Sequence, residues 1–237
     1  IWKGLVGSEM CIRDSNYGIL RTSAEDLKFY AKEIAEMGFQ MNTHAIGDST
    51  VSVLLNEYKK ILKDIDDPRW RIEHSQVVDI NEFELYNEKI LPSIQPTHAT
   101  SDMYWAYDRL GSRIKGAYAF KDLLNSSGRV ALGTDFPVEK VNPFHTFYSS
   151  VERKDLSGYP ENGFQMENSL TREETLKGMT IWGAYFNFEE HEKGSLEVGK
   201  SADFIVLNQN IMEVEADLIP NTEVIQTYID GELVYSK

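Results

Sequence analysis

Four short extended runs of this chain each end in a histidine or an aspartate, and this repetition constrains the fold more than any other feature. The runs "FQMNTH", "RWRIEH", "LPSIQPTH" and "RVALGTD" end at His44, His74, His98 and Asp135. Successive ends lie roughly 30 residues apart, which is about the length of one strand–helix unit in a (β/α)8 barrel. A polar group that closes a buried strand needs a partner, so these four positions are the first candidates for chemistry.

The segments between these runs have the spacing of amphipathic helices, with apolar residues recurring every three or four positions. In the first segment Thr22 and Glu25 have the pattern of a capping box, and Gly38 suits the end of the helix. Thr171 and Glu174 repeat the capping pattern further along the chain. The expected helices cover residues 22–38, 49–65, about 80–88, about 113–125, 142–155 and 170–188.

Strands that alternate with helices predict a parallel α/β sheet covered by helices. We expect part of a (β/α)8 barrel over residues 16–190, with the strand ends at the mouth where barrel active sites lie. An open doubly wound sheet is the alternative architecture. From Gly194 onward the composition becomes β-rich, and Asp230-Gly231 between two such runs is typical of a two-residue hairpin. Residues 191–237 are therefore expected to form a small β module.

The charge of the chain excludes some classes of partner. Its 237 residues carry a formal net charge of −14, whereas nucleic acids and anionic membranes require a basic face. No apolar run approaches the ~18 residues of a membrane-spanning helix. The single cysteine, Cys11, excludes an intramolecular disulfide and a multi-cysteine metal site. It lies in residues 1–15, which lack helical or strand periodicity and which we interpret as a non-native or disordered leader.

The residue types at the strand ends favour metal chemistry. Imidazole and carboxylate groups are suitable ligands for zinc or a similar divalent ion. A single histidine is more often structural than functional, but three histidines and one aspartate at successive strand ends favour a site. Other chemistries lack their motifs, because the chain has neither the G-x-S-x-G turn of a serine nucleophile nor the glycine-rich patterns that hold nucleotide phosphates.

The motifs "NTHAIGD", "RIEHSQ", "SIQPTHATSDMYWAYDRLG", "GTDFPVEKVNP" and "KGSLEVGKSADFIVL" occur in this order, and over residues 17–237 the chain resembles the amidohydrolase superfamily. It is most similar to the family 3 branch, which includes N-substituted formamide deformylase-like enzymes. The resemblance implies a metal-dependent hydrolase with a small β-sandwich beside its barrel. It places His44, His74 and Asp135 as metal ligands at the ends of strands five, six and eight, with Asp135 also the catalytic acid and base. Thr97 and His98, at strand seven, would face the substrate.

Two ligand elements of that family are not identifiable in this chain. The family carries a His-x-His pair on the first strand, and this branch carries a lysine on the fourth, but no His-x-His occurs among the five histidines here. We therefore expect a C-terminal fragment of a longer enzyme, inactive by itself and able to self-associate through an open barrel edge. The parent enzyme would hold one or two divalent ions, with zinc as the expected metal.

The expected reaction is hydrolysis of the carbon–nitrogen bond of a small amide-type substrate by metal-activated water. We expect the loop "ATSDMYWAYDRLG" to form a wall of the substrate pocket with Asp102, Tyr104, Trp105 and Arg109, although packing alone would equally explain Trp105. Arg71 and Glu73 either orient the ligand histidines or pair with neighbouring helices. The rival functions are a non-catalytic metal- or small-molecule-binding homologue, a structural fragment without a site and, within the superfamily, a ring deaminase.

Overall fold

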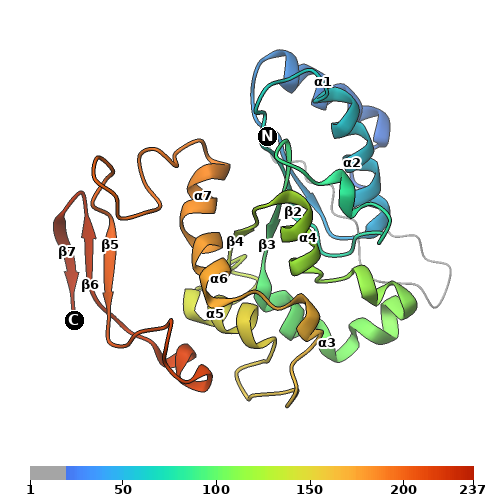
Figure 1. Cartoon of the computed structure of the whole chain (residues 1–237). Coiled ribbons are helices and arrows are strands. Elements are labelled where there is room, and N and C mark those ends of the chain that lie inside the picture. Colours follow the sequence, from blue (N-terminus) through green and yellow to red (C-terminus); the bar gives the residue numbers. More distant parts are fainter. Residues whose placement is uncertain (1–19) are drawn as a thin grey trace. The chain divides into compact units, whose positions relative to one another are not determined.

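The computed structural model describes residues 20–237, so the expected leader over residues 1–15, with Cys11, lies outside the described residues. The chain forms two compact units whose elements are shown in Figure 1. Of the described residues, unit 1 contains 20–94 together with Ser101–Val130, and unit 2 contains Gln95–Thr100 and Ala131–Lys237. Over the described residues, no helix combines the length and the apolar character needed to cross a membrane.

Unit 1 contains three parallel strands, β1 (Asn42–Ala45), β2 (Trp70–His74) and β3 (Ile90–Ile94). The strand β2 lies between the other two, with Thr43 paired to Ile72 and Ile72 paired to Pro92. Alternate residues of β2 are buried, and the side chains of Trp70 and Ile72 are almost inaccessible to solvent. These pairings confirm the parallel sheet that the alternation of strands and helices predicted. In a parallel sheet the carboxyl ends of the strands lie at one edge.

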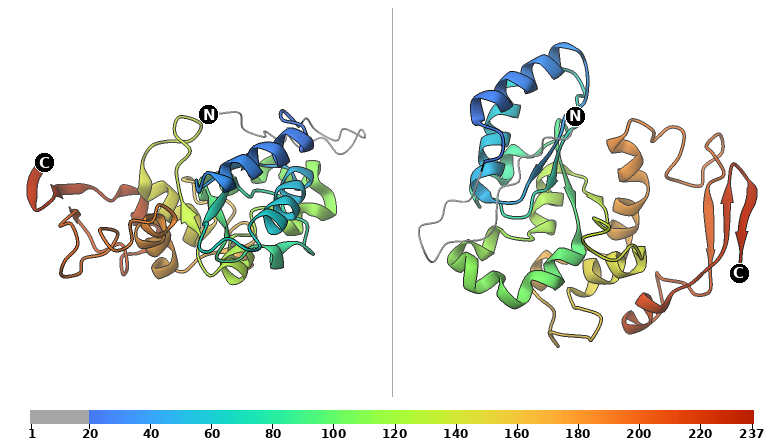
Figure 2. Two further views of the ribbon diagram at one scale, coloured as in Figure 1. Left: turned by 90° about the horizontal axis from the view of Figure 1, so that it is seen from above. Right: turned by 180° about the vertical axis from the view of Figure 1, so that it is seen from behind.

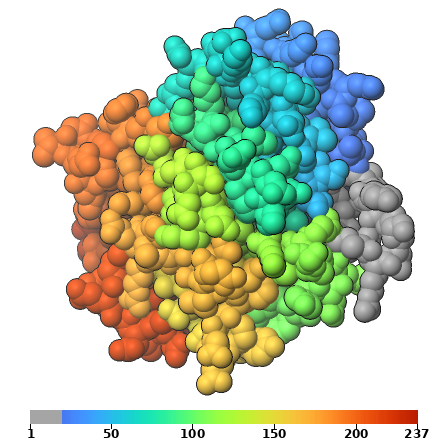
Figure 3. Space-filling model, turned by 45° about the vertical axis from the view of Figure 1, so that its right-hand side comes forward, coloured from blue at the N-terminus to red at the C-terminus, as the bar shows by residue number. Residues whose placement is uncertain are grey.

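Helices α1 (Ala24–Glu36) and α2 (Asp48–Ile61) confirm the two helices expected from the apolar spacing. The cap of α1 is one residue later than predicted, because the hydroxyl of Ser23, rather than that of Thr22, accepts a hydrogen bond from the Asp26 amide at 3.0 Å. Helix α2 packs against β1 and β3. In the space-filling view α1 and α2 lie side by side at the surface of unit 1 (Figure 3).

The helix expected over about 113–125 is two elements. The first, η2 (Gly111–Gly116), is a 3₁₀ helix, and the second, α4 (Phe120–Ser127), is an α-helix. Tyr118 separates them, because its φ of 52° lies in the left-handed region that a right-handed helix cannot include. The short helix expected before β3 is a single 3₁₀ turn, η1 (Phe83–Leu85).

The segment predicted to be a loop beyond β3 is instead the helix α3 (Pro96–Leu110). No glycine or second proline interrupts residues 97–110, and Ala106 and Leu110, which lie one turn apart, are buried. Gly111, with a φ of 56°, follows the last helical residue. The loop prediction was wrong because small alanines occupy buried positions where a helix more commonly has large apolar residues.

Unit 2 contains the short strand β4 and further helical elements: β4 (Ala131–Leu132), α5 (Pro143–Glu152), η3 (Met166–Asn168), α6 (Arg172–Met179), α7 (Ile181–Phe186) and η4 (Ala216–Asn221). The capping box expected from Thr171 and Glu174 is present, with both of its hydrogen bonds. The single helix expected over 170–188 is broken at Thr180, whose φ of −129° and ψ of −97° are not helical. Strand β4 packs against both α6 and α7.

The β-rich end of the chain forms a three-stranded antiparallel sheet, β5 (Phe204–Leu207), β6 (Val224–Ile229) and β7 (Glu232–Ser236) (Figure 2). Asp230 and Gly231, with φ values of 50° and 79°, form the expected two-residue turn between β6 and β7. Every residue of β7 is exposed. The predicted hairpin is therefore confirmed. This hairpin belongs to a sheet with much accessible surface.

Candidate metal centre

Strands β1 and β2 bring two of the predicted ligands to the same edge of the unit 1 sheet. His44 is the third residue of β1, and His74 is the last residue of β2. The register pairs Ala45 with His74 and His44 with Glu73, so the two histidines are diagonal neighbours on adjacent strands. His74 is buried and His44 is partly buried, so their contact is shielded from most of the solvent.

The imidazole rings of His44 and His74 each turn one nitrogen toward the other. His44 Nδ1 lies 2.8 Å from His74 Nε2, and the ring centroids are 4.9 Å apart. One nitrogen donates the hydrogen bond and the other accepts it. Two nitrogen ligands of a tetrahedral zinc ion, with bonds of about 2.0–2.1 Å, stand about 3.3 Å apart. The pair therefore has the donor chemistry, and nearly the spacing, that a divalent metal requires.

Arg71 and Glu73, the candidates for orienting these histidines, form an ion pair within β2. Arg71 Nε lies 3.2 Å from Glu73 Oε1, and both side chains are mostly buried. The two residues are two positions apart, so they lie on the same face of the strand. This ion pair joins two residues of the same strand.

In unit 2, His98 contacts two carboxylates. Its Nε2 lies 3.0 Å from Asp135 Oδ2, and its Nδ1 lies 3.3 Å from Glu139 Oε1. Burial lowers the pKa of His98, but hydrogen bonds and charges from Glu139 and Asp135 outweigh it, so that this pKa lies above its usual value. The carboxylates thus favour a protonated imidazole that donates a hydrogen bond from each ring nitrogen.

Glu139 was not identified from the sequence. The amides of Val138 and Glu139 both donate to the Asp135 carbonyl, at 2.8 and 3.3 Å, so the chain turns sharply after the aspartate. This turn places both carboxylates within reach of His98. The available signal was the second acidic residue in "GTDFPVE", one turn beyond Asp135.

The remaining predicted site residues lie on α3. Thr97 is buried in the first turn of the helix, next to His98. Trp105 is partly buried, and Arg109 is exposed in the last turn. Thr97 and His98 belong to unit 2, whereas Trp105 and Arg109 belong to unit 1.

Groups that are able to hold a divalent ion occur in both units. His44 and His74 belong to unit 1, and His98 and Asp135 belong to unit 2. Unit 1 offers two imidazole groups that face one another, and unit 2 offers an imidazole beside a carboxylate. Imidazole and carboxylate groups are the donors that zinc and related ions accept.

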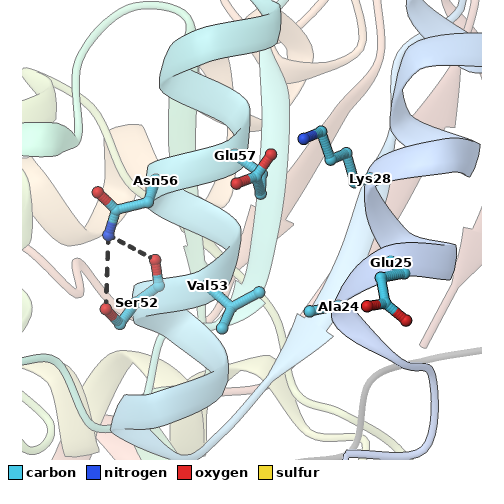
Figure 4. Close-up of a pocket in the computed structure, with 7 residues that line it drawn as sticks. All are labelled: Ala24, Glu25, Lys28, Ser52, Val53, Asn56 and Glu57. Atoms are coloured by element: carbon cyan, nitrogen blue, oxygen red, sulfur yellow. Dashed lines mark hydrogen bonds between the residues drawn. The ribbon is translucent and has the colours of Figure 1, made fainter.

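A hollow of about 350 Å³ opens between α1 and α2 of unit 1 (Figure 4). Lys28 on α1 and Glu57 on α2 point toward one another across it. On its α2 side, Asn56 Nδ2 donates to the Ser52 carbonyl at 2.9 Å. None of the predicted site residues lines this hollow, so it is distinct from the candidate metal centre.

Curated proteins share sequence similarity with most of this chain. It is 31% identical over 227 residues to the amidohydrolase YtcJ of Bacillus subtilis (strain 168), a match that covers 94% of this chain and 42% of that protein. It is 21% identical over 223 residues to the N-substituted formamide deformylase of Arthrobacter pascens, covering 91% of this chain and 40% of that protein. The chain therefore spans about 40% of the length of the curated relatives it matches.

Solved structures agree with the fold of the chain. The crystal structure of a metal-dependent hydrolase from Pyrococcus horikoshii OT3 matches it with a TM-score of 0.73 and 27% identity, covering 85% of this chain and 40% of that one. The α/β architecture with a parallel sheet is consistent with part of a barrel. The pattern of the amidohydrolase family matches residues 9–235. This match includes every motif on which the resemblance rests, and the chain belongs to the amidohydrolase family.

Proposed function

We propose that the parent of this chain is a metal-dependent hydrolase that cleaves the carbon–nitrogen bond of an amide or N-substituted formamide. The observation that carries the proposal is the imidazole pair at the ends of β1 and β2, with facing nitrogens 2.8 Å apart. Membership of the amidohydrolase family supports hydrolytic chemistry. The name of the relative from Arthrobacter pascens supports formamides as the substrate class.

The proposed metal ligands are His44, His74 and Asp135. Zinc is the proposed ion, because neutral imidazole and carboxylate groups are common among its ligands. A bound divalent metal lowers the pKa of water towards neutrality. In the parent, a His-x-His pair and a lysine outside this chain complete the set and decide between one and two ions.

Asp135 is the proposed acid and base. Its carboxylate accepts a proton from the attacking water and returns that proton to the departing nitrogen. His98 holds Asp135 Oδ2 at 3.0 Å and is itself held by Glu139, so this network orients the carboxylate. Thr97, His98, Trp105 and Arg109 are proposed to line the substrate site.

In the parent, β1–β4 are proposed to be strands five to eight of a (β/α)8 barrel over residues 16–190, and β5–β7 to be part of a small β-sandwich over 191–237. The match to the hydrolase from Pyrococcus horikoshii supports this assignment. The isolated chain is proposed to self-associate, because within residues 20–237 β1 lies at the end of its sheet. Exposed strand edges readily pair with other chains.

The proposal is tested with the full-length parent, purified and loaded with zinc. N-substituted formamides, simple amides and ring amines are supplied, and formate, carboxylate and ammonia are measured separately. Release of formate or carboxylate together with an amine supports the proposal. Ammonia released only from ring amines would indicate a deaminase instead, and a zinc-loaded parent that converts none of these substrates contradicts the proposal. The same protein stripped of metal serves as the control.

A further inference from the structure

The turn that follows His74 has an uncommon backbone. His74 and the next residue, Ser75, both have positive φ values, 72° and 44°. Residues other than glycine adopt this conformation uncommonly, and two of them in succession indicate that the surrounding structure imposes it. The Tyr86 hydroxyl donates to Ser75 Oγ at 2.8 Å, and Ser75 Oγ donates to the Ile72 carbonyl at 3.0 Å. The direction of the His74 ring therefore depends on the groups that hold this turn.

The backbone beyond this turn is hydrogen-bonded to the segment between η2 and α4. The Tyr118 amide donates to the Gln76 carbonyl at 2.8 Å, and the Val78 amide donates to the Gly116 carbonyl at 2.9 Å. Gly116 allows this approach, because a Cβ there would lie 1.9 Å from the Val78 carbonyl oxygen. The residues that follow His74 are thus tied along their length to residues 116–118.

Asp102 on α3 joins the two sides of this pairing. Its Oδ2 accepts hydrogen bonds from the Tyr118 hydroxyl at 2.8 Å and from Gln76 Nε2 at 3.2 Å. Gln76 Nε2 also donates to the Tyr118 hydroxyl oxygen at 3.1 Å, which closes a three-membered network. Gln76 and Tyr118 are buried, so the loss of the shared acceptor would leave their donors without water to replace it.

We propose that Asp102 is a positioning residue for His74. Its carboxylate fixes Gln76 and Tyr118, these two residues hold the left-handed turn, and the turn aims the imidazole. This inference rests on the proposed function, in which His74 is a metal ligand. Asp102 was also expected to form part of a wall of the substrate pocket, and the proposed positioning role uses its Oδ2, which accepts from Gln76 and Tyr118.

The test compares Asp102→Ala and Asp102→Asn in the full-length parent. Supporting groups behind a metal ligand typically contribute about 10–100-fold in metal affinity or activity. Asp102→Ala is expected to weaken zinc affinity, measured by chelator competition, by that factor, and to lower kcat more than it changes KM. In the metal-free protein it should shift the NMR signals of the His74 imidazole. Asp102→Asn retains one acceptor oxygen and should recover most of the affinity.

Asp108→Ala is the matched control, because Asp108 is an exposed aspartate on the same helix and its loss should change none of these quantities. If Asp102→Ala does not fold, Tyr118→Phe, which removes only the hydroxyl, is measured instead, with a smaller loss expected. Unchanged zinc affinity and unchanged His74 signals in these variants, while His74→Ala loses zinc, would overturn this inference alone. Full zinc binding by His74→Ala would overturn the proposed function as well.

Discussion

Asp135 and Asp230 have similar backbone conformations and different surroundings. Each follows a strand, β4 or β6, and their φ values of 58° and 50° lie in a region that aspartate tolerates better than most residues. Asp230 precedes Gly231 in an exposed hairpin turn. Asp135 instead lies 3.0 Å from a partly buried histidine. An aspartate after a strand is therefore a turn residue or a candidate for chemistry according to the partner that the fold supplies.

The largest expected effect separates these two aspartates directly. Asp135→Asn in the full-length parent should lower kcat by about 10²–10⁴-fold, because the amide cannot accept and return a proton. Asp230→Asn should leave kcat unchanged, because asparagine suits the same hairpin position. Both variants should keep the circular dichroism spectrum of the parent. Activity of Asp135→Asn within tenfold of the parent would remove the distinction.

The histidines offer a similar contrast between a strand end and an exposed position. His44→Ala or His74→Ala should reduce the zinc content of the full-length parent, because each removes one nitrogen of the facing pair. His191→Ala is the control, since the side chain of His191 is 91% exposed. Zinc is measured by elemental analysis after gel filtration. Equal zinc content in all three variants would assign the pair a purely structural role.

The two sheets should differ in stability when a large side chain is removed. Trp70 on β2 is buried and packs edge-on against Tyr58, with ring centroids 4.8 Å apart, so Trp70→Ala should cost about 3–5 kcal/mol. Leu233 on β7 is 51% exposed, so Leu233→Ala should stay within about 0.5 kcal/mol. Urea unfolding of the parent followed by fluorescence measures both. Similar losses would show that β7 is covered in the parent.

The smallest expected effect concerns His98 and the pH. Because its folded-state pKa is raised above that of the unfolded chain, protonated His98 stabilises the fold. This contribution is complete below the unfolded pKa and is lost as the pH rises through the folded pKa. Glu139→Gln removes one of the groups that raise this pKa, so the pKa should fall and the stabilisation at low pH should shrink.

NMR titration of the metal-free protein measures this pKa, and urea unfolding across the same pH range measures the stability. Glu161→Gln, at an exposed glutamate of unit 2, is the control. An identical His98 titration in both variants would exclude the contact with Glu139.

Local patterns predicted the elements whose causes are local. Thr171 and Glu174 form their capping box with each other, three residues apart. Asp230 and Gly231 make their turn through backbone preferences of their own. The alternating burial of β2 follows from residues two positions apart in one strand. In each case the interacting groups lie within a few residues, so the sequence carried the whole signal.

Distant partners decided the rest. The helix expected over about 113–125 is interrupted at Tyr118. The hydroxyl of this residue is hydrogen-bonded to Gln76 and Asp102, which lie 42 and 16 positions away. The contact of His98 with Asp135 joins residues 37 positions apart. Apolar spacing reports which face of an element is buried, but it does not report which distant group that face meets. The order and type of most elements therefore followed from the printed residues, whereas the partners that orient each histidine arose only when the packed chain brought those groups together.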